Sequence, residues 1–578
     1  MSVSSRNRDL LILAGICFFC FFFRLGAVSL FDFNEGLYVE AAREIYLSGD
    51  FVTPRFNGHV FFDKPPLALW ETAVSFHIFG VNEFAARLPV AIAATLLVLL
   101  TWWFGARFFS PRAGLLAGAI LALSPLYFGT ARQMTMDIHQ SLWFGAAMIC
   151  FFLGYTSDCA KGKRWYLGFW IACGLAVMSK SVPGLFPIPA ALVFTLVHER
   201  FQWRNVFRRI RECRPFVGLL LLAAVIIPWH YLAHRSNGFV FYQEYWLLHH
   251  VQLATGNDFN HHAPLYYYVP ALLAGLLPWG FILPWALRYR PNNSTSEDVQ
   301  DLDSHRTAWT FTVVWFATIF IIFSLMNSKL VSYLLPLYPA AALLVGVWLD
   351  KNWESRSGNG FALGISGIAV VFAGCAVAAV IYIDRISSID SADMEYPAVT
   401  WLWAAHATSA AAIIGVAAAI FAWRKLNGRA TVSLAGSMFA LVLFADLEGI
   451  PSFESNVNGP LHALAREMGE KMSGGVPAAI HIGQPRKPSV LFYLPAVAFT
   501  IDPLKSPSAD IIVERGEKEP IDAFLSFYRP AYVLTDARRA QSLMNSTNDL
   551  YVEETRGRWV LLRAMPAQSA YRALPRRN

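Results

Sequence analysis

The chain has little charge for its length. Of its 578 residues only 15% are Asp, Glu, Lys or Arg, whereas 56% are hydrophobic and the mean hydropathy is positive. An ordinary soluble chain carries about 25% charged residues, so this composition excludes a typical soluble domain and predicts an integral membrane protein. The net charge of +7 does not indicate nucleic acid as a partner. Most of the positive charge lies in short loops between apolar runs, where it sets membrane orientation.

Cysteine is scarce as well. The seven cysteines lie in apolar runs or in short loops, and residues 451–578 contain none, so neither a disulfide framework nor a CxxC metal site is indicated. The chain also lacks an evident internal repeat, which disfavours a transporter built from two similar halves. No small-residue cleavage site follows the apolar run 10–23, which we interpret as a retained first span rather than a signal peptide.

Apolar runs of a length that crosses a bilayer, about 17–25 residues, recur along the first 450 residues. They lie near 10–29, 88–106, 113–130, 138–155, 165–180, 182–198, 215–233, 265–286, 308–327, 330–349, 360–383, 398–423 and 431–450. These runs predict about thirteen spans. With a cytoplasmic N-terminus, every loop on the cytoplasmic side is basic, as the positive-inside rule requires. The long loops 30–87 and 234–264 then lie on the outer side. Within the first of them, residues 37–47 and 67–79 are predicted to form two short helices that lie in the plane of the membrane interface.

Hydropathy falls after residue 450. Between 456 and 578, short β-rich runs alternate with helix-like stretches, which predicts a small α/β domain on the outer side. The chain thus divides into a transmembrane domain, 1–450, and an outer domain, 451–578, whose role the sequence does not indicate.

Charged residues gather at the outer ends of the predicted spans. They are Asp32, Glu35, Asp63, Lys64, Arg132, Asp137, Lys180 and Lys329. Charge near hydrocarbon is costly, so such residues form a functional-site hypothesis. If they share one face of the membrane, they can build a single pocket for an amphiphilic molecule. Three structural alternatives stay open: solvated carboxylates in a capping loop, a snorkelling anchor for Lys329, and a helix cap for Asp137.

Several segments at these outer ends carry a recognisable pattern. They read YVEAAREIYLSGDFVTPRFNG (38–58), FFDKPPL (61–67), ARQMTMD (131–137), MSKSVPGL (178–185), HAPLYYYVPALLAGLLPW (262–279) and SKLVSYLLPLYPA (328–340). Together they resemble the GT-C glycosyltransferases of the protein O-mannosyltransferase superfamily, over the whole chain. The branch most similar to them contains the 4-amino-4-deoxy-L-arabinose transferases of lipid A.

The resemblance implies a fold, a location and a reaction. We expect a polytopic α-helical GT-C fold of about 13 transmembrane helices in a bacterial inner membrane, with a small C-terminal periplasmic α/β domain. We expect an inverting enzyme that moves a sugar, 4-amino-4-deoxy-L-arabinose, from undecaprenyl phosphate to a phosphate of lipid A on the periplasmic face. A cationic sugar on lipid A lowers its attraction for cationic peptides, so polymyxin resistance is an expected consequence.

Two alternative functions stay open. The first keeps the donor chemistry but uses a protein hydroxyl or another glycan as the acceptor. The second is a transporter for a lipid-linked sugar, which the scarcity of charge inside the predicted spans disfavours.

The chemistry of such a transfer points to two sets of residues. The departing lipid phosphate needs positioned cations, for which Lys64, Arg55, Arg132 and Lys329 are candidates, together with Tyr333.

The acceptor side is served by a carboxylate acting as a base, and the candidate catalytic residues are Asp32, Asn34, Glu35 and Asp137. Family members commonly show Asp-Glu where this chain has Asn34-Glu35. A phosphate acceptor is already largely ionised at neutral pH, so it tolerates the loss of that aspartate better than a hydroxyl does.

Histidines are dense in the second outer loop. His249, His250, His261 and His262, with Asp63 of the first loop, are candidate ligands for a divalent metal ion such as zinc. Their spacing matches no recognised ligand pattern, and contact with lipid phosphates or with solvent is the simpler interpretation. No cofactor is firmly required by the sequence.

Overall fold

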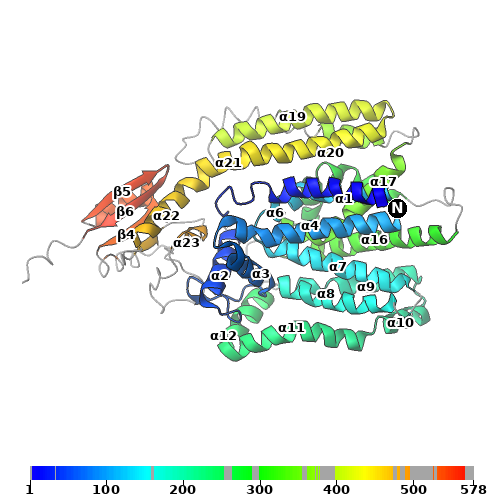
Figure 1. The fold of residues 1–578 in the computed structure, drawn as a ribbon, viewed down its shortest axis with the longest axis horizontal. Coiled ribbons are helices and arrows are strands. Elements are labelled where there is room, and N and C mark those ends of the chain that lie inside the picture. The colour runs from blue at the N-terminus through cyan, green and yellow to red at the C-terminus, as the bar shows by residue number, and fades with distance from the viewer. Residues whose placement is uncertain are drawn as a thin grey trace, which may run out of the picture.

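The computed structural model contains a helical bundle with a small α/β unit at one end (Figure 1). It describes residues 3–32, 34–157, 160, 162–252, 263–289, 299–354, 361–370, 373–374, 377, 398–472, 478–481, 488–494, 525, 530–547 and 549–565.

Long apolar helices run side by side through the bundle, together with shorter helical segments (Figure 1). They are α1 (Val3–Cys17), η1 (Phe18–Phe22), α4 (Glu83–Phe108), α5 (Pro111–Ala122), α6 (Pro125–Ala131), α7 (Met136–Thr156), α8 (Trp165–Lys180), α9 (Pro187–His198), α11 (Pro215–Asn237), α14 (Tyr268–Gly275), α15 (Leu283–Arg288), α16 (Val299–Leu325), α17 (Tyr338–Asn352), α19 (Ala398–Trp423) and α20 (Asn427–Phe444). Within the described residues six helical segments are long and apolar enough to cross a membrane, or seven if α5 and α6, bent by 63°, form one span. The chain is therefore a helical membrane protein, and the count of about thirteen spans stays a prediction.

Caps, prolines and small residues shape the bundle. Ser110 caps α5 by accepting a hydrogen bond from the backbone N–H of Ala113, and Pro111 follows at the first helical position, where its fixed φ suits a helix start. α4 and α5 approach so closely that a Cβ on Gly114 would lie 2.4 Å from the backbone nitrogen of Ala106. Small residues permit this contact between membrane helices.

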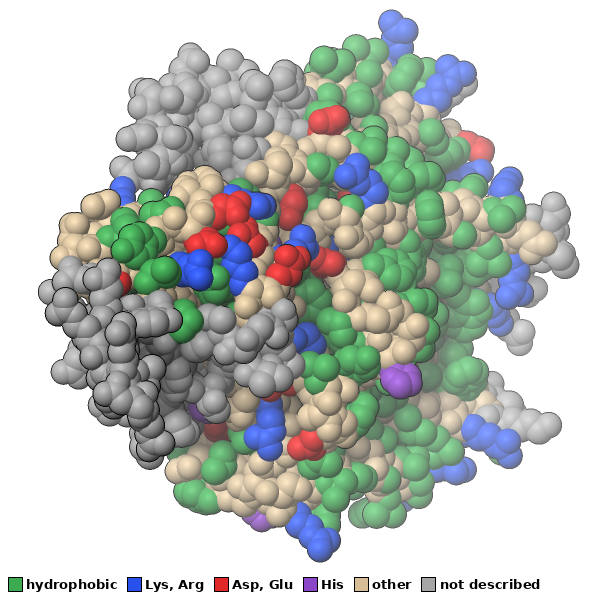
Figure 2. Space-filling model, turned by 60° about the vertical axis from the view of Figure 1, so that its left-hand side comes forward, with side chains coloured by type: hydrophobic (Ala, Val, Ile, Leu, Met, Phe, Trp, Pro, Cys, Tyr) green, Lys and Arg blue, Asp and Glu red, His purple; other side chains and the backbone are tan. Residues whose placement is uncertain are grey.

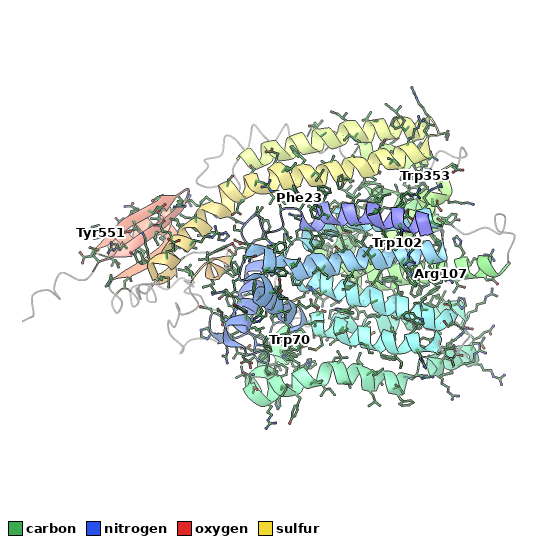
Figure 3. All side chains as sticks on the ribbon, viewed as in Figure 1. Phe23, Trp70, Trp102, Arg107, Trp353 and Tyr551 are labelled. Atoms are coloured by element: carbon green, nitrogen blue, oxygen red, sulfur yellow. The ribbon has the colours of Figure 1, made fainter. Side chains whose placement is uncertain are left out.

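The first outer loop covers one end of the bundle, which we call the α2 end. It contains α2 (Asn34–Ser48), the two-stranded hairpin β1 (Arg55–Phe56) and β2 (His59–Val60), and α3 (Leu67–Phe79). The predicted helices 37–47 and 67–79 are both confirmed. Figure 3 labels Trp70 at this end, and Arg107 and Trp353 at the opposite end, which we call the α10 end. α10 (Trp203–Glu212) and the N-terminus both lie at the α10 end (Figure 1).

A continuous helical run connects the bundle to the C-terminal unit. α20 continues through η8 (Ala445–Gly449), α21 (Ile450–Phe453) and η9 (Glu454–Asn458) into α22 (Gly459–Met472). The predicted domain boundary at residue 450 therefore falls inside a continuous helical run.

A four-stranded sheet forms the core of this unit, in the order β3-β4-β6-β5. Its strands are β3 (Ala478–His481), β4 (Ala531–Asp536), β5 (Leu550–Arg556) and β6 (Trp559–Ala564), and only β3 and β4 pair in parallel. Alternate residues of β4 face opposite sides: Val533 belongs to a core with α25 (Ala537–Ser546), whereas Leu534 belongs to the main core with α22. The α/β character predicted for residues 456–578 is confirmed within the described part, and acidic and basic side chains lie interspersed over its surface (Figure 2).

Candidate active site

Polar side chains from five elements meet at the α2 end. Tyr38 Oη donates a hydrogen bond to Asp63 Oδ2 at 2.7 Å, and Lys64 Nζ donates to Asp63 Oδ1 at 2.6 Å. Lys180 pairs with Asp137. Its Nζ lies 4.4 Å from the ring centroid of Tyr333, which belongs to η7 (Val331–Leu337). We call this group the site cluster. Its members are Tyr38, Asp63, Lys64, Asp137, Lys180 and Tyr333.

The two ion pairs of the site cluster lie near each other. The charges of both Asp63 and Asp137 act on the Tyr38 hydroxyl, and those of Lys64 and Asp137 act on Tyr333. Burial and then the Asp63 carboxylate raise the pKa of Tyr38 well above its usual value, so this hydroxyl stays a donor. Both lysines are satisfied by carboxylates here, and an anionic ligand can take over those cations by displacing the carboxylates.

Local sequence holds these groups in place. Pro65 and Pro66 follow Lys64 directly and fix φ before α3 begins, which stiffens the backbone that carries the ammonium group. Asp137 lies in the first turn of α7 and Lys180 at the last residue of α8. Each charge therefore complements the dipole of its own helix.

Two of the predicted phosphate ligands lie apart from this cluster in their described contacts. Lys329 is 7% exposed, and its ammonium group donates to the carbonyl oxygen of Met326. Arg55 is half-buried on β1, where its backbone pairs with Val60. The phosphate-binding role of either residue stays a prediction.

Arg132 joins the first span to the last. Its guanidinium lies 3.1 Å from Asp446 Oδ1 and donates to the carbonyl oxygens of Cys20 at 3.1 Å and Phe23 at 3.0 Å. The pair is buried, so the charge of Arg132 is already balanced inside the protein. This geometry favours a structural role over the predicted binding of donor phosphate. Asp446 escaped the sequence analysis, although an acidic residue in the apolar run 431–450 is itself a signal.

Glu35 occupies a buried hub rather than an open site. Its Oε1 accepts from Arg87 Nε at 2.7 Å and from the backbone N–H of Met134 at 3.1 Å. Its Oε2 accepts from Arg87 Nη2 at 2.8 Å and from the backbone N–H of Phe31 at 2.7 Å. Since both oxygens are engaged, the geometry favours a positioning role for Glu35 over the predicted role as a base.

Asp32 and Asn34 lie beside this hub. Asn34 is exposed at the first residue of α2, and Asp32 Oδ1 accepts a hydrogen bond from the backbone N–H of Ser489 at 2.9 Å. Asp137 is therefore the one predicted catalytic residue that the described contacts bring into the site cluster.

A chain of hydrogen bonds attaches the C-terminal unit to the α2 end. His462 of α22 contacts Ser29 Oγ through Nδ1 at 2.5 Å and Ser489 Oγ through Nε2 at 2.8 Å. Ser489 opens α23 (Ser489–Phe492), and a Cβ on Gly36 of α2 would lie 2.4 Å from its backbone nitrogen. No pattern in the sequence indicates this attachment, because Ser29 and Asp32 lie more than 400 residues from their partners His462 and Ser489.

The predicted metal site is not tested by the structure. His261 and His262 lie outside the described residues, as do the side chains of His249 and His250 in η4 (Tyr242–Gln252). In the part of the chain that is described, no group of three His, Cys, Asp or Glu side chains is placed to hold a metal ion. Asp63 is engaged by Tyr38 and Lys64.

Glu44 of α2 has a raised pKa. Burial, and then the charge of Glu40, raise the pKa of Glu44 to about 7, although the backbone N–H of Gly58 opposes the shift. Between its ordinary value and about 7, the folded protein binds a proton that the unfolded chain does not. The free energy of unfolding should therefore fall as pH rises through that window and level off above it.

This pH dependence is testable by substitution. We expect Glu44→Gln to flatten the fall in thermal unfolding temperature between about pH 5 and about pH 8. Glu448→Gln, at an exposed carboxylate in η8, is the matched control. An unchanged slope in Glu44→Gln would contradict the assignment.

Comparison with known proteins finds a family model and several relatives that this chain resembles. The model of the family described as dolichyl-phosphate-mannose-protein mannosyltransferase matches residues 63–232. The undecaprenyl phosphate-alpha-4-amino-4-deoxy-L-arabinose arabinosyl transferase of Edwardsiella ictaluri is 32% identical over 347 residues, 59% of each chain. The enzyme of the same name from Aeromonas hydrophila is 30% identical over 350 residues, 59% of this chain and 60% of that one. These matches therefore span less than two thirds of the curated relatives.

Solved structures share the fold over nearly the whole chain. ArnT from Cupriavidus metallidurans bound to undecaprenyl phosphate superposes with a TM-score of 0.77 and 23% identity, covering 98% of this chain and 100% of that one. The archaeal oligosaccharyltransferase AglB from Archaeoglobus fulgidus superposes with a TM-score of 0.51 and 13% identity, covering 93% and 69%. The predicted resemblance is confirmed: the chain is similar in sequence to aminoarabinose transferases over 59% of its length, and it shares the fold of ArnT over nearly all of it.

Proposed function

We propose that this protein is an inverting glycosyltransferase that moves 4-amino-4-deoxy-L-arabinose from undecaprenyl phosphate to a phosphate of lipid A. The observation that carries the proposal is the site cluster, where Lys64 and Lys180 present two cations at one end of the membrane bundle. Relatives that match 59% of this chain are named for the same donor and sugar.

An apolar cavity next to the cluster suits the lipid part of the donor. It has a volume of about 460 Å³, and Ser181, the residue after Lys180, is one of its lining residues. Tyr245 Oη donates to Ser181 Oγ at 3.0 Å on its wall. Its other lining residues are mainly aliphatic and aromatic, as a polyprenyl chain requires, and come from α8, η3 (Val182–Leu185), α11, α12 (Phe239–Phe241) and η4.

The proposed reaction is a single displacement. A phosphate oxygen of lipid A attacks the anomeric carbon, the bond from that carbon to the donor phosphate breaks, and its electron pair leaves with undecaprenyl phosphate. Lys64 stabilises the charge that develops on the departing phosphate. Asp137, held by Lys180, orients the acceptor and faces the positive charge that builds on the sugar. No proton has to be removed from an acceptor that is already ionised.

The proposed topology puts this chemistry in the periplasm. We infer about thirteen spans, a cytoplasmic N-terminus, and a periplasmic C-terminal unit in the bacterial inner membrane. The support is the excess of basic residues at the α10 end, where Arg107, Arg112, Lys351 and Arg424 lie at or beside helix ends. The positive-inside rule assigns such an end to the cytoplasm.

Mass spectrometry of lipid A tests the acceptor and the sugar together. Deleting the gene from its host should remove the aminoarabinose-modified species, and the wild-type gene should restore it. Unchanged lipid A with an altered glycoprotein or other glycan would instead support the alternative acceptor. Unchanged glycolipids and proteins with a defect in moving the lipid-linked sugar would support the transporter.

Asn34 gives a separate test of the acceptor. We expect Asn34→Asp to change the transfer rate by less than about tenfold, because an ionised phosphate gains little from an added base. The rate would be measured with purified protein, donor and lipid A. A large gain in rate would argue against a phosphate acceptor.

A further inference from the structure

α10 (Trp203–Glu212) lies between α9 and α11, at the end of the bundle opposite the site cluster (Figure 1). Arg200 and Arg214, which flank it, both have a φ of 50°. The chain therefore turns sharply as it leaves α9 and again as it enters α11. A short amphipathic helix held between two membrane helices in this way lies along the membrane surface.

One face of α10 is anchored to the bundle by paired charges. Arg209 Nε donates to Glu199 Oε1 at 3.0 Å, and its Nη1 donates to Glu212 Oε2 at 3.2 Å. Lys163 Nζ donates to Glu212 Oε2 at 2.5 Å, and Tyr155 Oη donates to Glu199 Oε1 at 2.7 Å. Two cations and two carboxylates thus cancel each other, and these contacts fix the rotation of α10 about its axis.

The other face of α10 presents an aromatic stripe beside a basic one. Trp203 and Phe207 are 61% and 60% exposed, and their ring centroids lie 6.4 Å apart. Arg204, Arg208 and Arg211 are exposed and share a face because they are spaced by four and three residues. In the described part of the chain, no ion pair joins these three arginines to a carboxylate.

A hollow of about 560 Å³ opens on this face. Its walls are Arg204, Phe207, Arg208, Arg211 and Glu212. The exposed first turns of α11 continue the apolar surface, with Phe216 84% exposed and Leu220 71% exposed. The arginines of α10 therefore lie next to the apolar surface of α11. A phospholipid needs both, because it has a charged head group and apolar acyl chains.

We propose that this face of α10 binds an anionic diacyl phospholipid of the adjacent leaflet. Arg204, Arg208 and Arg211 hold its phosphodiester, since guanidinium groups match phosphate geometry. The acyl chains lie along Trp203, Phe207 and the exposed start of α11. The positive-inside rule accounts for the number of basic residues here. It does not explain why three of them line up beside aromatic rings, or why the charges on the face of α10 that contacts the bundle are all paired.

Lipid retention by the purified full-length protein tests the proposal. Native mass spectrometry after titration with phosphatidylglycerol or phosphatidylcholine should show preferential retention of phosphatidylglycerol. Arg204→Gln/Arg208→Gln/Arg211→Gln should weaken that retention at least about tenfold. The control Arg6→Gln/Arg424→Gln/Arg429→Gln removes the same charge from exposed positions of the same end and should retain the lipid as the unchanged protein does. Equal loss in both variants, or no preference for phosphatidylglycerol, would overturn the proposal.

A second measurement tests the proposal even if the triple arginine variant fails to fold. A photoreactive benzoylphenylalanine at Phe207, in an otherwise unchanged chain, should cross-link to phosphatidylglycerol and much less to phosphatidylcholine. Raising the salt concentration should lower the yield, because it screens exposed charge. Equal cross-linking to both lipids, unaffected by salt, would show a nonspecific lipid contact and contradict the proposed site.

Discussion

Lys64→Ala should lower the turnover number of sugar transfer by about 10²–10³-fold, the effect of removing one preorganised group that stabilises charge in a transition state. Lys64 lies at the open side of the site cluster, paired with Asp63 at 2.6 Å and 22% exposed. Because the charge on the departing phosphate develops during the reaction, the loss should fall more on kcat than on KM. The assay is transfer from the lipid-linked donor by purified protein.

A lysine at the opposite end provides the control. Lys351→Ala removes an exposed lysine near the end of α17 and should leave transfer unchanged. Both variants should keep the unfolding temperature of the unchanged protein, since neither lysine is deeply buried. Near-normal turnover in a folded Lys64→Ala protein would refute its role at the phosphate.

Arg87→Ala should destabilise the protein by about 3–5 kcal/mol, because breaking a buried ion pair leaves its partner charge uncompensated. Arg87 is 1% exposed and donates to both oxygens of Glu35. It also donates to the carbonyl oxygens of Leu25 at 3.1 Å, Val28 at 2.9 Å and Ser29 at 2.9 Å. The loss would therefore loosen the connection between the first span and α2.

The magnitude can be read from thermal unfolding in detergent. Arg466→Ala is the matched control, since Arg466 pairs with Glu83 at 2.7 Å but is 53% exposed, and exposed pairs are worth at most about 1 kcal/mol. A second variant, Glu35→Gln/Arg87→Met, should recover part of the stability because it leaves no buried unpaired charge. Equal losses of stability in Arg87→Ala and Arg466→Ala would contradict the structural role of the buried Arg87–Glu35 pair.

The sequence predicted those parts of the site that local chemistry determines. Asp63-Lys64 before two prolines, Asp137 at a helix start and Lys180 at a helix end all lie in the site cluster. Each is a charged residue at the end of an apolar run, where burial is costly without a function or a partner. The motif around Tyr38 also signalled the family, although the sequence did not indicate that its hydroxyl meets Asp63.

Pairing across long stretches of sequence was not predictable. Glu35 meets Arg87 from the start of α4, and Arg132 meets Asp446 from η8, which follows α20. A single chain shows which charges lie near the membrane surface, but not which of them neutralise one another. For that reason Glu35 and Arg132 were candidates for chemistry, whereas the structure places both in buried pairs that hold elements together.

The fold, like the site, has features that the sequence predicted and features that it did not. Hydrophobic runs predicted most helices, the helices of the first outer loop and the α/β character of the C-terminal unit. The continuous helical run from α20 to α22 was not expected, because hydropathy falls after residue 450 and suggested a boundary there. Pro451 lies inside this run, directly after the π-helical turn η8, and local changes of helix type of this kind accommodate proline in membrane helices.

Reconstituted transfer tests the central claim most directly. Purified full-length protein in vesicles would receive undecaprenyl phosphate-linked aminoarabinose together with lipid A, and both lipids would be followed by mass spectrometry. The account predicts equal amounts of aminoarabinose-modified lipid A and free undecaprenyl phosphate, with both products formed about 10²–10³-fold more slowly by Lys64→Ala. Consumption of the donor without modification of lipid A, or full activity in the Lys64→Ala protein, would contradict it.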